Sequence, residues 1–455
     1  MSKKVHLIAI GGSAMHNMAL ALHEKGFLVS GSDDEINEPS KSRLAKAGLL
    51  PSQIGWFPNK INTDLDAVIV GMHARAENPE LLRAKELGLK IYSYPEYIYE
   101  ATKDKTRIVI GGSHGKTTIT AMILHVMKHA GLETDFMVGA QLEGFSTMVK
   151  FSNTSKYAVI EGDEYLASPI DRRPKFHLYH PHIAIISGIA WDHINVFPTF
   201  DIYVDQFRQF INLIEPSGHL VYCSEDEVLN ELCVTTSGNN IGKHPYSVPE
   251  HSIEDGTTFL HVKEKKIPLL IFGKHNLMNL EGARMVCNHA GISDENFYQA
   301  IQSFKGAAKR LELVFKEQKF NFYKDFAHSP SKLKATTNAV KEQFAGRELV
   351  ACMELHTFSS LNEEFLAQYK GAMDLADEAI VYFNPHTIAH KKLKEITVEQ
   401  VESAFHKKGL KVFTESKQVT DHLKSKHWNN KVLLMMSSGN FDGVDFNQLA
   451  KELTL

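Results

Sequence analysis

The sequence predicts an α/β protein of three domains, each built on a mostly parallel sheet, with a small antiparallel part added to the central domain. Strand-like apolar runs alternate with helical patterns in three separate stretches, and such alternation is typical of parallel sheets. The chain has 455 residues, which is too long for a single hydrophobic core. We place the domains at residues 1–104, 105–309 and 310–455.

The first domain begins with a Rossmann-like pattern of strands and helices. The turn after its first strand reads Ala9-Ile10-Gly11-Gly12-Ser13-Ala14, where alanines replace two glycines of a G-x-G-x-x-G loop. That replacement weakens the case for a dinucleotide site. The polar residues 99–106 are expected to form a linker. The strands of this domain are expected at residues 5–10, 27–34, 66–71 and 89–95.

The second domain opens with a phosphate-binding loop. Residues 107–127 (RIVIGGSHGKTTITAMILHVM) pass from a β-branched run through glycines to a helix with one apolar face. A phosphate loop needs glycine N–H groups, a helix N-terminus, a lysine and a hydroxyl. Lys116 is therefore expected to bridge the β- and γ-phosphates, and Thr117 to ligate Mg²⁺. Three residues separate Gly111 from Gly115, one fewer than in a conventional Walker loop.

Later parts of the chain continue the alternation. Residues 241–272 are expected to form short β-segments with a hairpin around 263–266, and a third α/β pattern restarts near Leu311. A helix is expected at residues 331–344. The remaining strands are expected at 157–165, 182–193, 320–326, 348–355, 378–383, 410–413 and 431–439.

Composition narrows the class of protein. Charged residues make up 23% and the net charge is −4, so no basic field points to nucleic acid. The four cysteines show no CxxC spacing, which is typical of reduced, buried thiols. Because the sequence has neither a long apolar run nor a cleavable leader pattern, no membrane segment is expected. These features predict a cytoplasmic enzyme.

The phosphate loop resembles that of a known family. The motif G-[ST]-[HN]-G-K-T-T, which here runs over Gly112, Ser113, His114, Gly115, Lys116, Thr117 and Thr118, is similar to the ATP loop of the Mur ligases and of the related folylpolyglutamate synthetases. The resemblance covers nearly all of the chain. It implies an ATP-dependent ligase that forms a C–N bond between an acid and an amino acid or peptide, with Mg²⁺ as cofactor.

The resemblance implies a metal site near the loop. Mg²⁺ is expected at Thr117, at Glu161, which ends a strand-like run, and at His193 in the Asp-His pair of IAWDHINVF. Lys116 is expected to act in catalysis beside them, by positioning and by charge.

Further motifs imply the rest of the ATP site. GKHNLMN places Asn276 on the adenine side, and DFAHSP places Asp325 at the ribose and His328 at the border of the active site. Arg310 in KRLE is implied to reach the phosphates. Arg310 and His328 complete the expected catalytic group.

Two segments resemble one branch of the family. GMHARAENPEL (71–81) and EGDEYLASPIDRRPKF (161–176) are similar to the murein peptide ligases, which join UDP-N-acetylmuramate to the recycled tripeptide L-alanyl-γ-D-glutamyl-meso-diaminopimelate. A neighbouring branch adds L-alanine alone in de novo peptidoglycan synthesis. The first domain would then bind the UDP-sugar, and the third would close over ATP and bring the peptide. Substrate contacts are implied at Gly12, Ser13, Ser32, Asp33, His73, Arg75, Arg172, Arg173 and His356.

The chain departs from this branch at several positions. Leu166 stands where the branch often has Asp, and Ala190 where Glu often stands. His356 takes the place of an Arg expected to meet a carboxylate, and imidazole is a poorer fork for that group. The altered glycine loop of the first domain fits a UDP-binding variant. Arg172-Arg173 could equally be a solvated basic turn.

The implied reaction activates an acid. The UDP-N-acetylmuramate carboxylate attacks the γ-phosphate of ATP, and the amine then displaces phosphate from the acyl phosphate. Two other classes of function stay open. An NAD-dependent dehydrogenase would use the first domain and Asp33. A non-catalytic homologue that binds the UDP-sugar would explain the replacements at Leu166, Ala190 and His356.

Overall fold

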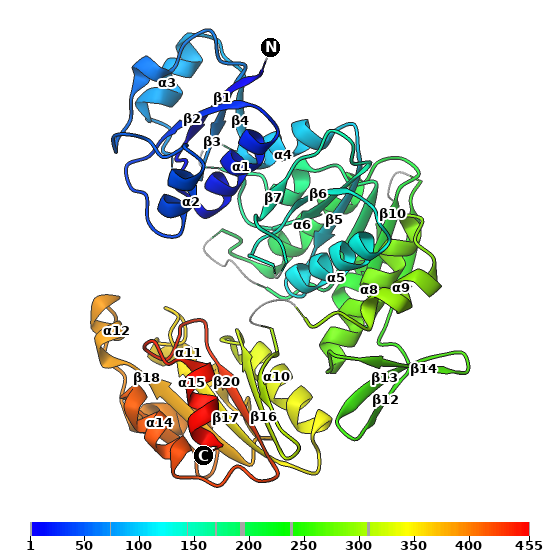
Figure 1. Ribbon diagram of the computed structural model, residues 1–455, viewed down its shortest axis with the longest axis vertical. Helices are drawn as coiled ribbons and strands as arrows, with labels where there is room; N and C mark the ends of the chain where they lie inside the picture. The colour runs from blue at the N-terminus through cyan, green and yellow to red at the C-terminus, as the bar shows by residue number, and fades with distance from the viewer. Residues whose placement is uncertain are drawn as a thin grey trace. The chain divides into compact units, whose positions relative to one another are not determined.

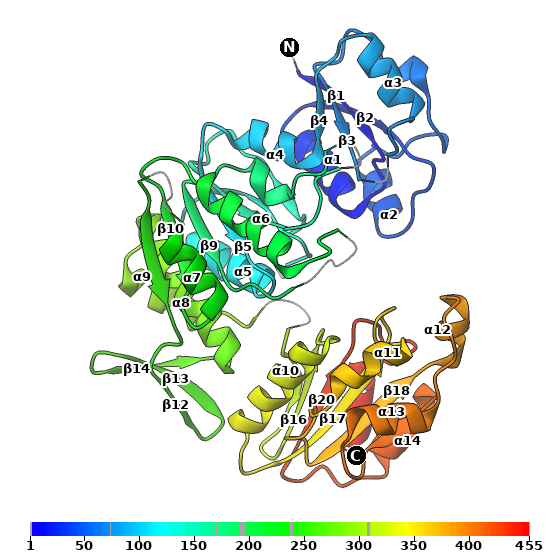
Figure 2. The ribbon, with the colours of Figure 1, turned by 180° about the vertical axis from the view of Figure 1, so that it is seen from behind.

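The computed structural model describes residues 2–72, 74–142, 144–168, 171–191, 196–236, 240–306 and 310–454. They form α/β domains with mostly parallel sheets and one small antiparallel sheet, as the sequence predicts (Figures 1 and 2). The chain divides into two compact units. The first holds Met1–Val248 and Met278–Ile301, and the second holds Pro249–Leu277 and Gln302–Leu455.

The N-terminal domain of the first unit is a parallel sheet in the order β2-β1-β3-β4. Its strands are short, and Val68, Val70 and Leu81 pack in one buried cluster with Ile8. The elements are β1 Lys4–Ile8, α1 Ser13–Glu24, β2 Leu28–Ser32, α2 Ser40–Lys46, β3 Ala67–Val70, α3 Pro79–Glu86, β4 Ile91–Ser93 and α4 Tyr94–Thr102.

The prediction of a linker at residues 99–106 is wrong at both ends of that stretch. Residues up to Thr102 belong to α4, and β5 begins at Thr106. A capping box starts α4, because the Ser93 side chain accepts the Glu96 N–H while the Glu96 carboxylate accepts the Ser93 N–H. The S-x-x-E spacing of Ser93 and Glu96 indicates a helix start in the sequence, but the polar last turn of the helix resembles a linker.

The middle domain is built on a sheet in the order β11-β10-β9-β5-β8-β6-β7, parallel except for β7. Helix α5 lies in front of this sheet in Figure 1 and α6 in front of it in Figure 2, so helices cover both faces. Strands buried on both faces read as continuous apolar runs. The elements are β5 Thr106–Gly111, α5 Lys116–His129, β6 Thr134–Met137, β7 Val149–Lys150, β8 Tyr157–Glu161, β9 Ile183–Ile186, α6 Phe200–Asn212, β10 His219–Cys223, α7 Glu227–Thr235, β11 Gly242–Tyr246, α8 Lys274–His289 and α9 Asp294–Ile301.

The parallel order determines where the loops meet. Strand β5 lies between β8 and β9 and is parallel to both. The carboxyl ends of these three strands therefore share one edge of the sheet, which is where α/β proteins place their ligands. The predicted phosphate loop follows β5, and Glu161 ends β8.

The second unit joins a small antiparallel sheet to the C-terminal domain. The hairpin predicted around residues 263–266 is present between β13 and β14. Thr258 Oγ1 donates to Gln343 Oε1 at 2.8 Å, which ties β13 to α10. The elements of the antiparallel sheet are β12 His251–Glu254, β13 Thr257–Val262 and β14 Lys265–Leu269.

The C-terminal sheet has the order β15-β16-β20-β17-β18-β19, with β15 antiparallel to β16 and the other pairs parallel. The helical stretch expected at residues 331–344 is α10. Within the described ranges, no helix has both the length and the hydrophobicity needed to cross a bilayer. The elements are β15 Glu312–Lys316, β16 Phe320–Asp325, α10 Pro330–Gln343, β17 Glu348–Leu355, α11 Glu363–Leu366, β18 Glu378–Phe383, α12 Pro385–His390, α13 Val398–Phe405, β19 Lys411–Phe413, α14 Ser416–Lys424, β20 Lys431–Met436 and α15 Phe446–Leu453.

Candidate active site

The phosphate loop turns sharply between β5 and α5, and glycines make the turn possible. Gly112 and Gly115 have φ of +124° and +77°, in the left-handed region. A Cβ on Gly115 would lie 2.4 Å from Asn279 Oδ1, and one on Gly112 would lie 2.2 Å from Ser187 Oγ. The backbone of the loop is therefore closely packed against its neighbours. The loop leads into the N-terminus of α5, whose free N–H groups suit an anion.

Lys116 is held by two acceptors. Its Nζ donates to the Gly112 carbonyl and to Glu164 Oε2, each at 2.6 Å. Burial lowers the pKa of Lys116, but the carboxylates of Glu164, Asp163 and Glu161 outweigh it and raise that pKa above its ordinary value. Lys116 therefore stays protonated throughout the neutral range, as a phosphate ligand must.

A second set of contacts fixes the partner of Lys116. The fully buried Tyr203, on α6, shares a hydrogen bond with Ser113 Oγ at 2.8 Å and donates to Glu164 Oε1 at 3.2 Å. One hydroxyl thus links the phosphate loop to the carboxylate that holds Lys116. Sequence analysis missed both residues. Glu164 lies in the EGDEY run that was noticed for Glu161, whereas Tyr203 carries no local signal.

Glu161 and Thr117 place oxygen atoms together beside the loop. The Thr117 hydroxyl donates to Glu161 Oε1 at 3.0 Å, and the Gly139 N–H donates to Glu161 Oε2 at 2.9 Å. Burial raises the pKa of Glu161 above its ordinary value, although the Gly139 N–H, Lys116 and Thr117 each lower it. A buried carboxylate next to a hydroxyl is a donor set that a hard cation prefers. His193, the third expected metal contact, lies outside the described residues.

The loop after β9 is fastened to the phosphate loop. Ala190 N–H donates to Ser113 Oγ at 2.9 Å, and the Ser187 hydroxyl donates to the His114 carbonyl. Thr118, the last residue of the motif, is buried in the first turn of α5. These contacts give Ser113, the His114 backbone and Thr118 a structural role in the motif.

The residues expected to bind UDP lie at the carboxyl ends of strands β1 and β2 of the N-terminal sheet. Asp33 Oδ2 accepts the Gly11 N–H at 2.6 Å, which closes the turn before Gly12, the N-cap of α1. Ser13 is exposed at that helix end. Ser32 is fully buried, and its hydroxyl accepts from Lys60 Nζ at 3.3 Å. Lys60 is a cation at this position that sequence analysis did not consider.

The basic residues expected near the sugar and peptide are more exposed. Arg75 and Arg172 are both exposed, and His73 lies outside the described residues. Arg173 is held by Asp171 within its own turn, at 2.6 Å between Nη2 and Oδ2. This contact favours the alternative of a solvated basic turn for Arg173.

In the second unit, Asp325 ends β16 and organises the following turn. Its oxygens accept the Leu311 N–H at 2.6 Å and the Ala327 N–H at 2.7 Å. Burial raises the pKa of Asp325, while these N–H groups and Arg310 lower it. The Arg310 guanidinium lies 4.9 Å from the centre of the Phe326 ring.

The other expected residues of the second unit have local partners. His328 Nδ1 lies 2.8 Å from the Phe326 carbonyl, and His356 Nδ1 lies 3.5 Å from Glu354 Oε1. Asn276 Nδ2 donates to the Phe272 carbonyl at 3.0 Å. In the first unit, Asn279 of the same GKHNLMN segment is the asparagine that faces Gly115.

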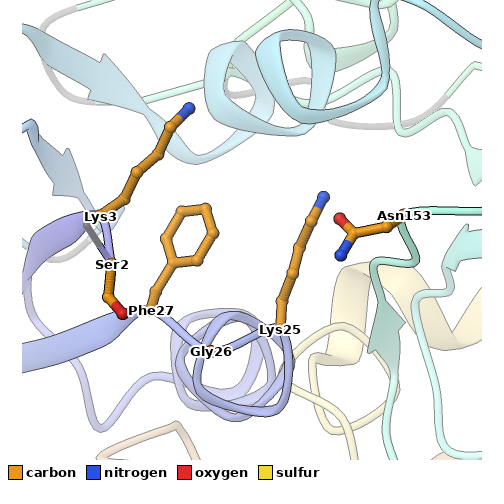
Figure 3. Close-up of a pocket in the computed structure, with 6 residues that line it drawn as sticks. All are labelled: Ser2, Lys3, Lys25, Gly26, Phe27 and Asn153. Carbon is orange, nitrogen blue, oxygen red and sulfur yellow. The ribbon is translucent and has the colours of Figure 1, made fainter.

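A pocket of about 640 Å³ lies elsewhere in the first unit. It is lined by Ser2, Lys3, Lys25, Gly26, Phe27 and Asn153 (Figure 3). None of the residues expected from the sequence lines it, and it is wide open to solvent. Charged and polar side chains gather around Lys116, so we place the candidate site there.

Fold and loop together define a class of protein, the phosphate-loop nucleotide-binding α/β proteins. Family models identify the member of that class. "Mur ligase family, catalytic domain" matches residues 4–106, "Mur ligase middle domain" matches 110–287, and "Mur ligase, glutamate ligase domain" matches 309–439.

Relatives agree with these models. A UDP-N-acetylmuramate–L-alanine ligase of Clostridium kluyveri is 32% identical over 394 residues, 84% of this chain and 83% of the relative. A UDP-N-acetylmuramate–L-alanyl-γ-D-glutamyl-meso-2,6-diaminoheptandioate ligase of Haemophilus influenzae is 27% identical over 97% of both chains. The crystal structure of a UDP-N-acetylmuramate–alanine ligase of Thermotoga maritima shares the fold, with a TM-score of 0.69, 20% identity and coverage of 99% of this chain and 98% of the other.

The chain belongs to the Mur ligase family. It is an ATP-dependent ligase that forms amide bonds in peptidoglycan synthesis. The family prediction is confirmed, and the dehydrogenase alternative is not supported.

Proposed function

We propose that the protein joins the carboxylate of UDP-N-acetylmuramate to the amine of the tripeptide L-alanyl-γ-D-glutamyl-meso-diaminopimelate. The ATP half of the proposal is supported by the hydrogen bonds that hold Lys116 to the Gly112 carbonyl and to Glu164. Similarity to the Haemophilus relative over 97% of both chains supports the peptide half. The 32% identity to an L-alanine ligase favours L-alanine as the second candidate amine.

The chain's own residues would assist by position and charge. Lys116 stays cationic beside the loop and would neutralise the phosphate oxygens as the sugar carboxylate approaches the γ-phosphate. The acyl phosphate formed this way gives the amine a good leaving group. Glu164 and Tyr203 would hold Lys116 in place rather than contact the substrate.

Thr117 and Glu161 fit a magnesium ion, since their oxygens lie 3.0 Å apart and Glu161 is buried. When bound there, Mg²⁺ would offset negative charge on the phosphates. His193 is proposed as a further ligand. Arg310, Asp325, Asn276 and His328 are proposed to complete the ATP site from the second unit.

The substrates would divide among the domains. We place UDP at the end of the N-terminal sheet, near Ser13 and Asp33, where the N-terminus of α1 offers N–H groups to an anion. His73, Arg75 and Arg172 are proposed contacts of the sugar and peptide. His356 is proposed to meet a carboxylate of the amine substrate from the C-terminal domain.

Coupled ADP release tests the ATP half. Lys116→Ala should abolish ADP release while UDP-N-acetylmuramate still binds, because the phosphate loop loses its cation. Lys175→Ala is the matched control, since Lys175 pairs with Asp163 at 2.6 Å in the neighbouring loop and makes no contact with the phosphate loop among the described hydrogen bonds. Equal turnover in both variants would remove the role assigned to Lys116.

A panel of amines tests the peptide half. We expect ADP release that requires both UDP-N-acetylmuramate and the tripeptide, with L-alanine, dipeptide and tetrapeptide as comparisons. Turnover with L-alanine but not with tripeptide would establish the second candidate. No turnover with any amine, despite tight UDP-sugar binding, would indicate a non-catalytic homologue.

A further inference from the structure

Three histidines of the first unit gather at a place that the ligase reaction does not use. His219 is the first residue of β10, His244 is the third residue of β11, and His289 is the last residue of α8. Both ribbon views show β10 beside α8 (Figures 1 and 2). The phosphate loop follows the carboxyl end of β5, whereas His219 begins its strand. Since β5, β9 and β10 are parallel, the histidines lie at the opposite edge of the sheet.

The rings are close enough to share one ion. One nitrogen from each ring lies within 4.8 Å of the corresponding nitrogens of the other two, and His219 Nδ1 is 3.1 Å from His244 Nε2. The His289 ring stacks on the His219 ring with 4.1 Å between their centres, and it is tilted against the His244 ring with 4.2 Å between centres. Zinc–nitrogen bonds of about 2.0–2.1 Å in a tetrahedral site require nitrogens about 3.3 Å apart. The His219–His244 separation is already close to that value, and the His289 ring would turn out of its stack on His219 to direct a nitrogen at the same ion.

Strand register and one glycine create the space. His219 is paired with Gly242 across β10 and β11, and His244 is two residues further along β11. Alternate residues of a strand share a face, so His244, Gly242 and His219 point the same way. A Cβ on Gly242 would lie 2.7 Å from His244 Nε2 and 2.9 Å from His219 Nδ1. Glycine therefore leaves room for both nitrogens at the point where they approach each other.

Two of the rings have a lowered pKa, which favours the neutral form that binds a metal. Burial and, to a smaller extent, the neighbouring His219 and His244 together lower the pKa of His289 to about 4. Burial likewise lowers the pKa of His244, with His219 adding to the effect. Neutral imidazoles present lone pairs at physiological pH, whereas three cations at this spacing would repel one another. The cluster is half-buried, so an ion can still reach it from solvent.

We propose that His219, His244 and His289 form a binding site for a divalent transition metal of the zinc class, separate from the ATP-linked magnesium site. A set of three imidazole nitrogens suits Zn²⁺, Ni²⁺ and Cu²⁺ far better than Mg²⁺, most of whose ligands are oxygens. Water would occupy the fourth position. The ion would tie the edge strand β11 to the end of α8, so we assign it a structural role.

Zinc titration followed by calorimetry tests the site, on the full chain in magnesium-free buffer. We expect one tight Zn²⁺ per chain, with binding at least about tenfold weaker in His244→Gln and in His289→Gln, since each removes a ligand. His129→Gln is the matched control, because His129 is also the last residue of a helix, α5, but is exposed and outside the cluster. It should bind zinc as the unaltered chain does.

Two further measurements separate this site from others. Co²⁺ in place of Zn²⁺ should give the visible absorption of a four-coordinate site with three nitrogen ligands and one oxygen ligand, lost in both cluster variants. Zinc should also raise the melting temperature of the unaltered chain but not of the cluster variants, whose melting without metal shows whether they fold. Zinc binding that is lost in Glu161→Gln but kept in His244→Gln would overturn the proposal. Absence of tight binding, or equal binding in all variants, would overturn it as well.

Discussion

The ion pair between Lys116 and Glu164 allows a sharp prediction, in which Glu164→Gln destabilises the middle domain and nucleotide partly reverses the loss. Glutamine keeps the shape of the side chain and can still accept from Tyr203, but it removes the negative charge next to Lys116. The lysine then stays buried with one neutral acceptor, the Gly112 carbonyl. The triphosphate would supply the missing negative charge.

The magnitude follows from burial. Breaking a buried ion pair by removing one partner costs about 3–5 kcal/mol of unfolding free energy. The Lys116 side chain is 15% exposed and the Glu164 side chain 2%, and Lys116 retains one acceptor, so we expect about 2–4 kcal/mol. For a domain of roughly 150–250 residues, each kcal/mol shifts the melting temperature by about 2–4 °C, which gives about 4–16 °C.

Differential scanning calorimetry with and without ATP measures this effect. Asp205→Asn is the control, since the Asp205–Arg208 pair on α6 has a similar separation of 2.9 Å but side chains that are 43% and 50% exposed. A solvent-screened pair of this kind contributes at most about 1 kcal/mol. If Glu164→Gln melts within about 1 °C of the unaltered chain, or if ATP raises both melting temperatures equally, Glu164 does not hold Lys116 as we describe.

Three other predictions concern the loop, the metal position and α4. Gly115→Ala should weaken ATP binding about tenfold by calorimetry, through left-handed strain and a clash with Asn279; Gly131→Ala, also left-handed but in open space, should leave it unchanged. Because burial raises the pKa of Glu161, Mg²⁺-dependent ADP release should fall as pH drops toward that raised pKa and recover above it. Glu161→Gln should abolish this pH dependence; an unchanged profile would exclude Glu161 as the titrating group. Ser93→Ala should lower unfolding stability by about 1 kcal/mol by calorimetry and leave the KM for ATP unaltered; a changed KM would contradict a purely local capping role.

Most strands could be predicted because their residues are buried on both faces. The stretch 348–355 coincides with β17, and 378–383 with β18. Strand β6 was not anticipated, since its run TDFM contains an aspartate. Asp135 is fully buried there and pairs with Lys105 Nζ at 2.6 Å. A buried charge is stable only with a partner, and that partner lies 30 residues earlier, beyond any local pattern.

The candidate site likewise has residues that the sequence predicted and residues that it did not. Gly115, Lys116 and Thr117 were predicted because a strand, a glycine turn and a helix N-terminus are encoded by neighbouring residues. The link from Ser113 through Tyr203 to Glu164 was not, because α6 reaches the loop only after the sheet has formed.

The sequence by itself therefore determined the α/β class, the phosphate loop and the family, since backbone preferences and hydrophobic periodicity act between neighbours. Only the tertiary structure decided which carboxylate holds Lys116, and only it gathered His219, His244 and His289 into one cluster. Strand order and register bring such groups together, and these depend on the packing of the whole domain.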